Sequence, residues 1–511
     1  MENPITLYGK YHIMYIVCFF NNTTNKNSKG FDLMEDEKKG LTAGHLTMMA
    51  LGTVIGGSFF LGSSVAIQST GPSIILSYIV CGILVYFILF ALSEMTVSTQ
   101  AAGSFRTFAS QYISEGTGYV VGWVYWTGMV IAMSSEATAV SLLVREWYPT
   151  VSLSLLGAFI IVVVTLLNLL GARQLSRLEG MLAAIKIFAI AAFIILGLLL
   201  IVGFIPGIPA VKSSLFRSEP FLKGGIKNLA GSMLIVLFTY AGFEIIGLAA
   251  TEAKDKQKTI PKAIHATVFS LITLYILCIT VLLFLVPTVT LNDNVSPLVS
   301  ALNRYNLNWA GTAMNIILIS AILSTMLAAM FGLGRMLRSL VEDGLGPKFL
   351  KDKTDVPYRG ILFSGFSMLC SLFVGLLFPR VYLFLISSGG FALLFTYIVL
   401  MFTHIRYRRK NGKPKGNCHM CGFPYSSFFT LIGLLVAMFS MPFAEGQTAG
   451  FFAGLLLVLF YSASYFIIKF FNARKLHKLL VKTSKLPSNG SFITEFSDEF
   501  HKSKHKNSDK N

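Results

Sequence analysis

Three ionisable side chains lie within long apolar stretches of this sequence, where an isolated charge is unfavourable. They are Glu136, Lys186 and Glu244, and each apolar stretch is long enough to cross a membrane. A charged group at membrane depth has to face a partner, backbone carbonyls or water, so such residues often mark binding sites and ion pathways. Because a buried lysine is able to bind and release a proton, we interpret Lys186 as a candidate proton carrier.

Each of these residues also has a structural interpretation. The Lys186 amine could reach the membrane interface along its own stem, or form a fixed pair with Glu136 or Glu244. Glu136 either pairs with Lys186 or approaches the amine of a substrate. Glu244 either binds backbone N–H groups freed by a broken helix or contacts substrate directly. Glu94, at the end of an apolar segment, is expected to be structural.

Two of the apolar segments carry glycines near their middle. The first reads GTVIGGSFFLG over residues 52–62, and the second reads FTYAGFE over residues 238–244. A broken membrane helix is tolerated where its freed backbone groups face protein or a polar cavity. Gly52 and Gly56 also have the GxxxG spacing of close helix packing, so packing is the alternative for the first segment. Interruptions in corresponding positions predict an inverted repeat, with a substrate site where the breaks meet.

The composition identifies the surroundings of these segments. Of the 511 residues, 54% are hydrophobic and 13% are charged, whereas soluble domains contain about 25% charged residues. Apolar runs of about 20 residues recur along the chain and predict about twelve membrane helices. The predicted segments are 45–70, 72–96, 118–144, 151–171, 181–203, 227–250, 264–287, 309–335, 360–378, 381–405, 427–445 and 448–471. The expected fold class is an all-α integral membrane protein.

Basic residues gather in alternate connecting segments and predict the orientation of the chain. Lysines and arginines are concentrated in 254–262, 338–359 and 406–415, and the intervening loops are poorer, apart from 204–226. Since basic loops are retained in the cytoplasm, both termini are expected there. Topology and anionic lipid headgroups then explain the net charge of +18, and no nucleic-acid partner is expected.

Two further features concern the ends of the chain and its cysteines. Residues 1–33 hold one apolar patch too short to span a membrane, and Met34 is an alternative natural start. Cys418-His419-Met420-Cys421 has a CxxC spacing with an adjacent histidine. A zinc site requires four ligands and no second pair lies nearby in the sequence, so we expect a reduced thiol pair of Cys418 and Cys421 and no metal.

Four stretches together resemble the amino acid permeases of the amino acid-polyamine-organocation superfamily, particularly the bacterial amino acid transporter group. They read HLTMMALGTVIGGSFFLG, ALSEMTVSTQAAGSFRTFASQYISEGTGYVVGWVYW, LFTYAGFEIIGLAATEAKDKQKTIPKAI and GRMLRSLVEDGLGPKFL. The resemblance extends from Leu41 to Phe470 and implies a LeuT-type fold with broken first and sixth helices. In that fold, residues 41–203 and 227–406 form inverted repeats of five helices, 427–471 add two helices, and 1–40 and 472–511 are cytoplasmic ends.

The two breaks would form the substrate site. Backbone N–H groups at the start of a half-helix, with the positive end of its dipole, suit the carboxylate of an amino acid. At the facing ends, freed carbonyl groups of Val54, Phe238 and Ala241 would accept from its ammonium group. The expected substrate-binding residues are Val54, Gly56, Gly57, Ser58, Phe238, Ala241 and Gly242. Similar permeases have glycine where this chain has Ser58, so a side chain narrows the space there.

The resemblance also implies how transport is coupled. In related proton-coupled permeases, a helix-five lysine occupies the place of a sodium ion between helices one and eight. By this comparison Ser324 and Thr325 neighbour Lys186, and a proton is the expected coupling ion in preference to sodium. No other cofactor is expected.

The expected function is therefore uptake of an amino acid with a proton. Phe238, Tyr240 and Phe243 predict an apolar pocket for a neutral aliphatic or aromatic L-amino acid. The expected setting is a bacterial cell membrane, without an obligate protein partner. An exchanger of amino acids and a sensor without turnover are the alternatives. An enzyme is not expected, because the sequence lacks HExxH, GxSxG and P-loop motifs.

Overall fold

The computed structural model describes residues 40–99, 105–170, 172–205, 220–291, 294–352, 356–414 and 416–484. Within these ranges the chain is helical, apart from turns and one isolated bridge between Leu41 and Ala253. The alternative start at Met34 and the end of the basic tail lie outside the described residues. The described part of the chain forms one unit up to Leu459 and a second unit from Phe460 onward.

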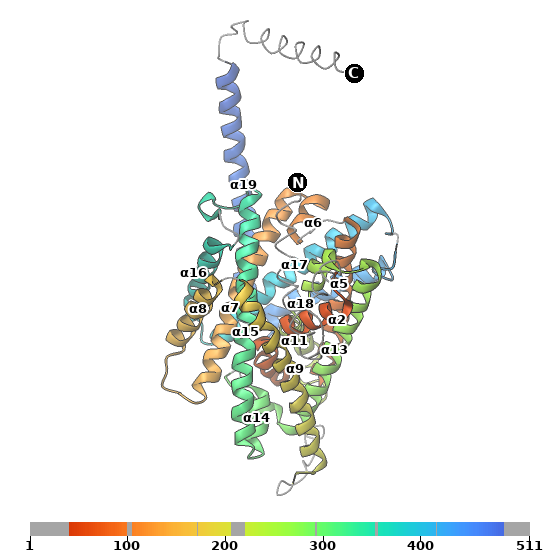
Figure 1. Cartoon of the computed structure of the whole chain (residues 1–511), viewed down its shortest axis with the longest axis vertical. Coiled ribbons are helices and arrows are strands. Elements are labelled where there is room, and N and C mark those ends of the chain that lie inside the picture. The colour runs from red at the N-terminus through yellow and green to blue at the C-terminus, as the bar shows by residue number, and fades with distance from the viewer. Residues whose placement is uncertain are drawn as a thin grey trace, which may run out of the picture. The chain divides into compact units, whose positions relative to one another are not determined.

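The helices follow the predicted apolar segments (Figure 1). The long ones are α5 (Ile74–Thr99), α7 (Glu115–Arg145), α8 (Leu153–Leu169), α9 (Ala172–Val202), α11 (Gly225–Thr239), α13 (Lys256–Leu285), α15 (Asn308–Glu342), α16 (Tyr358–Gly375), α17 (Val381–Asn411), α18 (Tyr425–Ser440) and α19 (Thr448–Ser484). Nine helical stretches of the described chain are long and apolar enough to cross a membrane, which supports the predicted all-α membrane protein.

Several elements differ from the prediction. α15 and α17 extend beyond the predicted ends at 335 and 405, because helical hydrogen bonding continues after hydropathy falls. Two short helices, α6 (Phe105–Tyr112) and α14 (Pro297–Arg304), were not predicted, because they are too polar to resemble spans. Turns of 3-10 helix lie at Gly71–Ser73, Ala249–Glu252, Thr288–Thr290, Lys348–Leu350 and Met441–Phe443.

The first predicted segment is interrupted at its glycines. α2 (Ala43–Val54) ends before Ile55 and Gly56, which have extended backbone conformations. The chain then resumes as α3 (Gly57–Phe60) and α4 (Gly62–Thr70). The glycine pair therefore lies at a break in the helix. Close packing of the small residues is compatible with that break.

The segment 227–250 is interrupted as well. α11 ends before Tyr240, and the short helix α12 (Ile245–Leu248) follows a turn that contains Gly242. Gly242 has a φ of 104°, a conformation that glycine adopts readily and other residues rarely do. The backbone of Gly242 therefore allows the turn that breaks this helix.

The two breaks are in contact, although they are far apart in sequence. The hydroxyl of Thr53 donates to the carbonyl oxygen of Gly242 at 3.3 Å. A Cβ atom on Gly242 would lie 3.0 Å from the carbonyl oxygen of Thr53, so this approach also requires a glycine. The structure thus brings the two interruptions together, as the sequence predicts.

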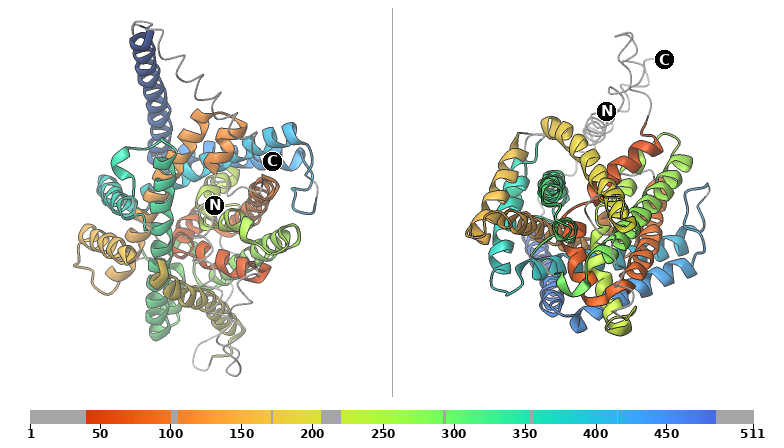
Figure 2. Two further views of the ribbon diagram at one scale, coloured as in Figure 1. Left: turned by 45° about the horizontal axis from the view of Figure 1, so that its top comes forward. Right: turned by 90° about the horizontal axis from the view of Figure 1, so that it is seen from below.

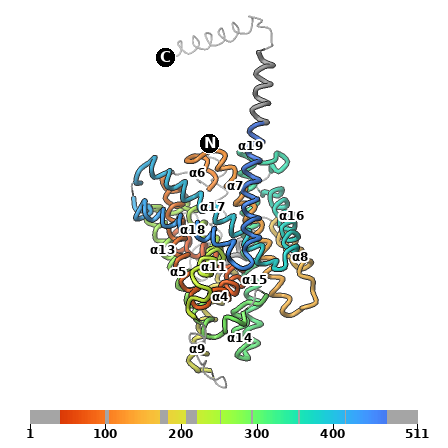
Figure 3. The backbone as a smooth tube through the Cα atoms, turned by 180° about the vertical axis from the view of Figure 1, so that it is seen from behind, coloured from red at the N-terminus to blue at the C-terminus, as the bar shows by residue number. Residues whose placement is uncertain are grey.

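Long helices from distant parts of the chain surround the breaks. α2 packs against α9 and α13, and α3 packs against α7, α11 and α15. Figure 2 shows the red segment of α2 to α4 among helices of later colours. From behind, α18 lies beside α11 and α17, with which it packs (Figure 3). This arrangement brings side chains of α7, α9 and α15 to the first break.

Candidate functional site

A carboxylate of the protein itself binds the N–H groups at the start of α3. Gly57 donates to Oε2 of Glu136 at 2.8 Å, and Ser58 donates to Oε1 at 3.3 Å. Glu136 comes from α7 and is 3% exposed. Glu136 was expected to meet Lys186 or a substrate amine, and this contact with the backbone was not predicted. The negative carboxylate complements the positive end of the α3 dipole, but the sequence does not show that Glu136 lies on the turn of α7 that faces the break.

Gly56 lies between Glu136 and Thr325. A Cβ atom on Gly56 would lie 3.4 Å from Oγ1 of Thr325 and 3.6 Å from Oε1 of Glu136. The carbonyl oxygen of Gly56 accepts from the N–H groups of Phe59 and Phe60, within the half-helix that follows. The break is therefore bordered by side chains of α7 and α15.

Lys186 contacts the end of α2, just before the break. Its Nζ atom donates to the carbonyl oxygen of Gly52 at 3.0 Å and to Oγ1 of Thr325 at 2.8 Å. The side chain is fully buried, so the interpretation in which the amine reaches the membrane interface is wrong. Thr325, an expected neighbour of Lys186, is thus in contact with it, and Ser324, the other expected neighbour, is buried in α15.

Glu244 caps the second break. Its Oε2 atom accepts from the N–H group of Gly242 at 2.9 Å. Tyr125 of α7 donates to Oε1 at 3.1 Å, and Tyr397 of α17 donates to Oε2 at 3.4 Å. These contacts match the structural interpretation of Glu244, in which the carboxylate binds backbone freed by the break.

The expected carbonyl acceptors differ in their surroundings. The carbonyl oxygen of Phe238 already accepts from the N–H group of Ala241 at 3.1 Å, so the break does not free it. Ala241 and Gly242 are partly exposed, whereas Val54 is buried at the end of α2. Of the three predicted carbonyl groups, that of Phe238 is least suited to bind an ammonium group.

The aromatic residues of the second break pack into clusters. The ring of Tyr240 lies 5.2 Å from that of Tyr275, and its hydroxyl donates to the carbonyl oxygen of Tyr78 at 3.0 Å. The ring of Phe243 lies 5.4 Å from that of Tyr397. Tyr240 and Phe243 are both fully buried, so the expectation that they form a substrate pocket is not supported.

An apolar groove of about 660 Å³ lies between α5 and α13. It is lined by Gly82, Ile83, Tyr86, Phe87, His265, Ala266, Val268, Phe269 and Ile272. None of the predicted site residues lines it, and Phe269 is 74% exposed. This groove therefore carries no support for the predicted substrate site.

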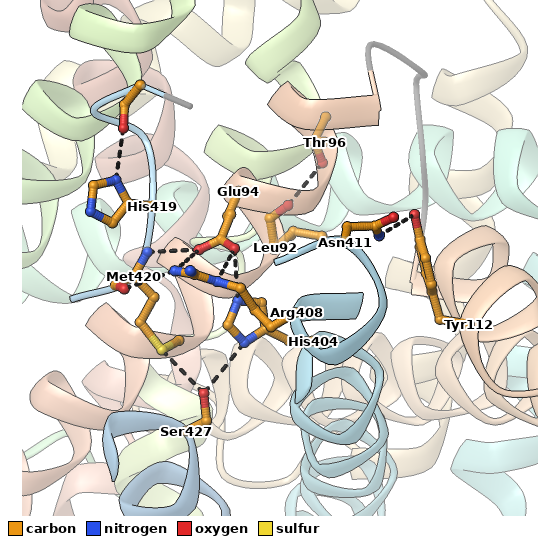
Figure 4. Close-up of polar contacts among 11 residues, drawn as sticks. Leu92, Glu94, Thr96, Tyr112, His404, Arg408, Asn411, His419, Met420 and Ser427 are labelled. Atoms are coloured by element: carbon orange, nitrogen blue, oxygen red, sulfur yellow. Dashed lines mark hydrogen bonds and ion pairs between the residues drawn. The ribbon is translucent and has the colours of Figure 1, made fainter. Parts of the chain in front are cut away.

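A second buried polar cluster surrounds Glu94 (Figure 4). Arg408 places Nε 2.5 Å from Oε1 and donates from Nη2 to Oε2 at 3.0 Å. The Nε2 atom of His404 lies 3.3 Å from Oε1, and the N–H group of Met420 donates to Oε2 at 2.7 Å. The cluster joins α5, α17 and the loop after α17, which agrees with a structural Glu94. Arg408, expected in a basic loop, is only 6% exposed.

The loop that carries Met420 places its two cysteines in different surroundings. Cys418 is buried, with its N–H group donating to Gln257 at 2.9 Å, whereas Cys421 is exposed. Among the described residues, no group of three or more His, Cys, Asp or Glu residues could hold a metal ion. Burial raises the pKa of the Cys418 thiol to about 12, and the negative charge of Glu94 adds to the rise.

The two cysteines should therefore differ in reactivity, because the thiolate is the nucleophile. At neutral pH, a water-soluble maleimide should label Cys421 of the folded protein and leave Cys418 unmodified. Peptide mass spectrometry scores each site separately. Cys421→Ser should remove the label from this loop, and the matched Cys418→Ser variant should retain it. Equal labelling of both thiols before unfolding would contradict the burial of Cys418.

Comparisons with known proteins identify the family. The sequence model of a family described as amino acid permease matches residues 45–481. The probable threonine/serine transporter YbxG of Bacillus subtilis (strain 168) is 31% identical over 84% of this chain and 95% of its own length. The gamma-aminobutyric acid permease of the same organism is 31% identical over 80% of this chain and 89% of its own length.

A further relative is the aromatic amino acid transport protein AroP of Escherichia coli (strain K12). It is 33% identical over 73% of this chain and 83% of its own length. The apolar helices and the bacterial relatives indicate a multi-pass protein of a bacterial cell membrane. The resemblance predicted from the four motifs is confirmed, and the chain belongs to the amino acid permease family.

Proposed function

We propose that this permease takes up a neutral L-amino acid together with a proton by alternating access. The proposal includes twelve spans with both termini in the cytoplasm, and inverted repeats at 41–203 and 227–406. The observation that carries it is the position of Lys186, a fully buried amine that bonds to both α2 and α15. The substrate site lies at the two breaks.

The amine of Lys186 suits a coupling role because of what its proton does to these bonds. A charged ammonium group has three donors and bonds strongly to the Gly52 carbonyl and the Thr325 hydroxyl, and loss of the proton weakens both contacts. These contacts join α2 to α15. A change in protonation therefore changes the free energy of one arrangement of the helices relative to another.

The charges near the breaks favour a neutral substrate. Glu136 and Glu244 already bind backbone N–H groups, so neither carboxylate is placed to bind a positively charged side chain of the substrate. The relative that transports aromatic amino acids supports the aromatic class, and the relative named for threonine and serine supports a smaller hydroxyl-bearing class. An aliphatic or aromatic amino acid is our first choice, and threonine is the first comparison.

Replacement of Lys186 tests proton coupling. Lys186→Met keeps an unbranched side chain but removes the titratable amine. A proton moving through ~100 mV contributes roughly 2.3 kcal/mol, enough for about fifty-fold accumulation of a neutral solute. In proteoliposomes with a panel of labelled amino acids, the wild type should accumulate one class under a proton gradient. The variant should lose this accumulation.

Lys262→Ala, which removes an exposed lysine at the start of α13, is the matched control and should transport normally. Proton and sodium gradients are imposed separately. Accumulation that follows sodium would overturn the proposed coupling ion. Uptake that requires internal amino acid would indicate an exchanger, and binding without uptake would indicate a sensor; both would overturn proton-coupled uptake.

A further inference from the structure

The N–H groups of Gly57 and Ser58 hold a carboxylate that belongs to the protein. The predicted substrate site assigns these donors to the carboxylate of the amino acid. The two oxygens of Glu136 accept one bond each, at 2.8 and 3.3 Å, which is the arrangement that a substrate carboxylate would need. A single N–H group makes one strong hydrogen bond at a time. Substrate and Glu136 therefore require the same donors.

We propose that Glu136 is a built-in competitor, which binds the carboxylate subsite and has to leave before an amino acid binds there. The inference rests on the proposed function, because it takes the breaks as the amino acid site. It adds a specificity role for Glu136: the affinity for any ligand with a carboxylate is lowered by the free energy needed to displace this side chain.

The space around the two donors supports displacement over shared binding. A Cβ atom on Gly57 would lie 2.5 Å from Oε2 of Glu136 and 3.1 Å from Cδ1 of Ile322. Ser58, Glu136 and Ile322 are all at least nine-tenths buried. The carboxylate is thus packed directly against the backbone, with an apolar side chain beside it. A second carboxylate cannot reach these donors while Glu136 remains.

The displaced side chain has polar groups within its surroundings. Oγ1 of Thr325 and Oε1 of Glu136 both lie close to the position that a Cβ atom on Gly56 would take, and Oγ1 of Thr325 accepts from the ammonium group of Lys186 at 2.8 Å. A carboxylate that leaves Gly57 can exchange two N–H donors for a hydroxyl and a positive charge. Binding of an amino acid would then be linked to Lys186 through Glu136, which is a coupling between two sites.

One experiment measures the competition with two amino acids and with an amine that lacks the carboxylate. Glu136→Gln keeps the size of the side chain but removes its charge and one of its two acceptor oxygens. Binding of L-phenylalanine, 2-phenylethylamine and L-threonine to purified protein is measured by scintillation proximity. Because a hydrogen bond to a charged group is stronger than one to a neutral group, E136Q should bind L-phenylalanine or L-threonine about tenfold more tightly than the wild type. Binding of 2-phenylethylamine, which lacks the carboxylate, should not change.

A second arm needs no knowledge of the substrate. Glu136→Ala leaves the two N–H groups without their carboxylate, and free acetate should replace it. Sodium acetate should raise the Tm of E136A more than the same concentration of sodium chloride does, and it should not do so for the wild type. Glu146→Gln, which alters a carboxylate that directly follows the C-terminal end of α7 and accepts from Asn303, is the control and should respond like the wild type.

The outcomes separate this inference from the proposed function. Tighter amino acid binding by E136Q or rescue of E136A by acetate supports the competitor. If E136A does not fold, E136Q decides: no gain in affinity for either amino acid, or an equal gain for 2-phenylethylamine, overturns it. Absence of both effects also overturns it. Failure of the wild type to accumulate any amino acid under a proton gradient, with acetate rescue intact, would overturn the proposed function alone.

Discussion

Glu94→Ala should lower the free energy of unfolding by about 3–5 kcal/mol, the usual cost of removing one partner from a buried ion pair. The substitution leaves the guanidinium group of Arg408 buried without its carboxylate, and it also removes the partner of His404 and of the Met420 N–H group. Glu94 and His404 are fully buried, so water cannot replace the lost contacts. Unfolding of purified protein in detergent, followed by heat or by denaturant, measures the loss.

A surface ion pair of the same chain is the matched control. Arg380 and Glu445 approach to 3.2 Å, but their side chains are 51% and 84% exposed. Glu445→Ala should therefore change the free energy of unfolding by less than about 1 kcal/mol. Equal losses in the two variants would show that burial does not determine the strength of the Glu94 cluster.

Gly242→Ala is expected to destabilise the contact between the two breaks and to abolish uptake. A residue other than glycine at a φ of 104° is strained by about 1–3 kcal/mol. In addition, the new Cβ atom would lie 3.0 Å from the carbonyl oxygen of Thr53, and a backbone atom cannot rotate away. The second break would have to move away from the first, and this movement would separate the two parts of the proposed substrate site. Thermal unfolding and proteoliposome uptake measure the two effects.

Gly332→Ala is the control for this substitution. Gly332 lies within α15, and an added Cβ atom there has nothing within 4 Å. Since alanine is favoured over glycine inside a helix by about 1 kcal/mol, this variant should be as stable as the wild type or slightly more stable. A Gly242→Ala variant that unfolds and transports like Gly332→Ala would show that the breaks tolerate separation.

Local backbone chemistry explains which parts of the site could be predicted. A glycine with positive φ, such as Gly242, and the paired glycines at 56 and 57 mark interruptions, because helical residues in hydrocarbon must otherwise keep their hydrogen bonds. An interior position was the expectation for Lys186 because an unpaired ammonium group is costly in lipid, but the sequence also allowed the amine to reach the membrane interface. That Thr325 neighbours Lys186 was predicted from the resemblance to known permeases.

Side-chain partners across the bundle could not be predicted in the same way. In a soluble protein, the apolar stripe of a helix shows which face points inward. α5 and α17 are apolar on most sides, so their sequences do not distinguish a face toward lipid from one toward protein. For this reason the sequence did not indicate that Arg408 reaches Glu94, or that Tyr240 packs in an aromatic cluster.

The sequence by itself determined the membrane setting, the family, the two broken helices and the presence of buried charges, because hydropathy and glycine position are properties of the chain alone. Only the tertiary structure decided which groups those charges meet. Glu136 binds the start of α3, Lys186 binds the end of α2, and Glu244 caps the second break. The partners of Glu136 and Lys186 depend on the rotation and depth of α7 and α9 within the bundle, which are set by packing against residues 78 to 139 positions away in the sequence. Glu244 instead binds Gly242, two residues earlier, within the turn that breaks the helix.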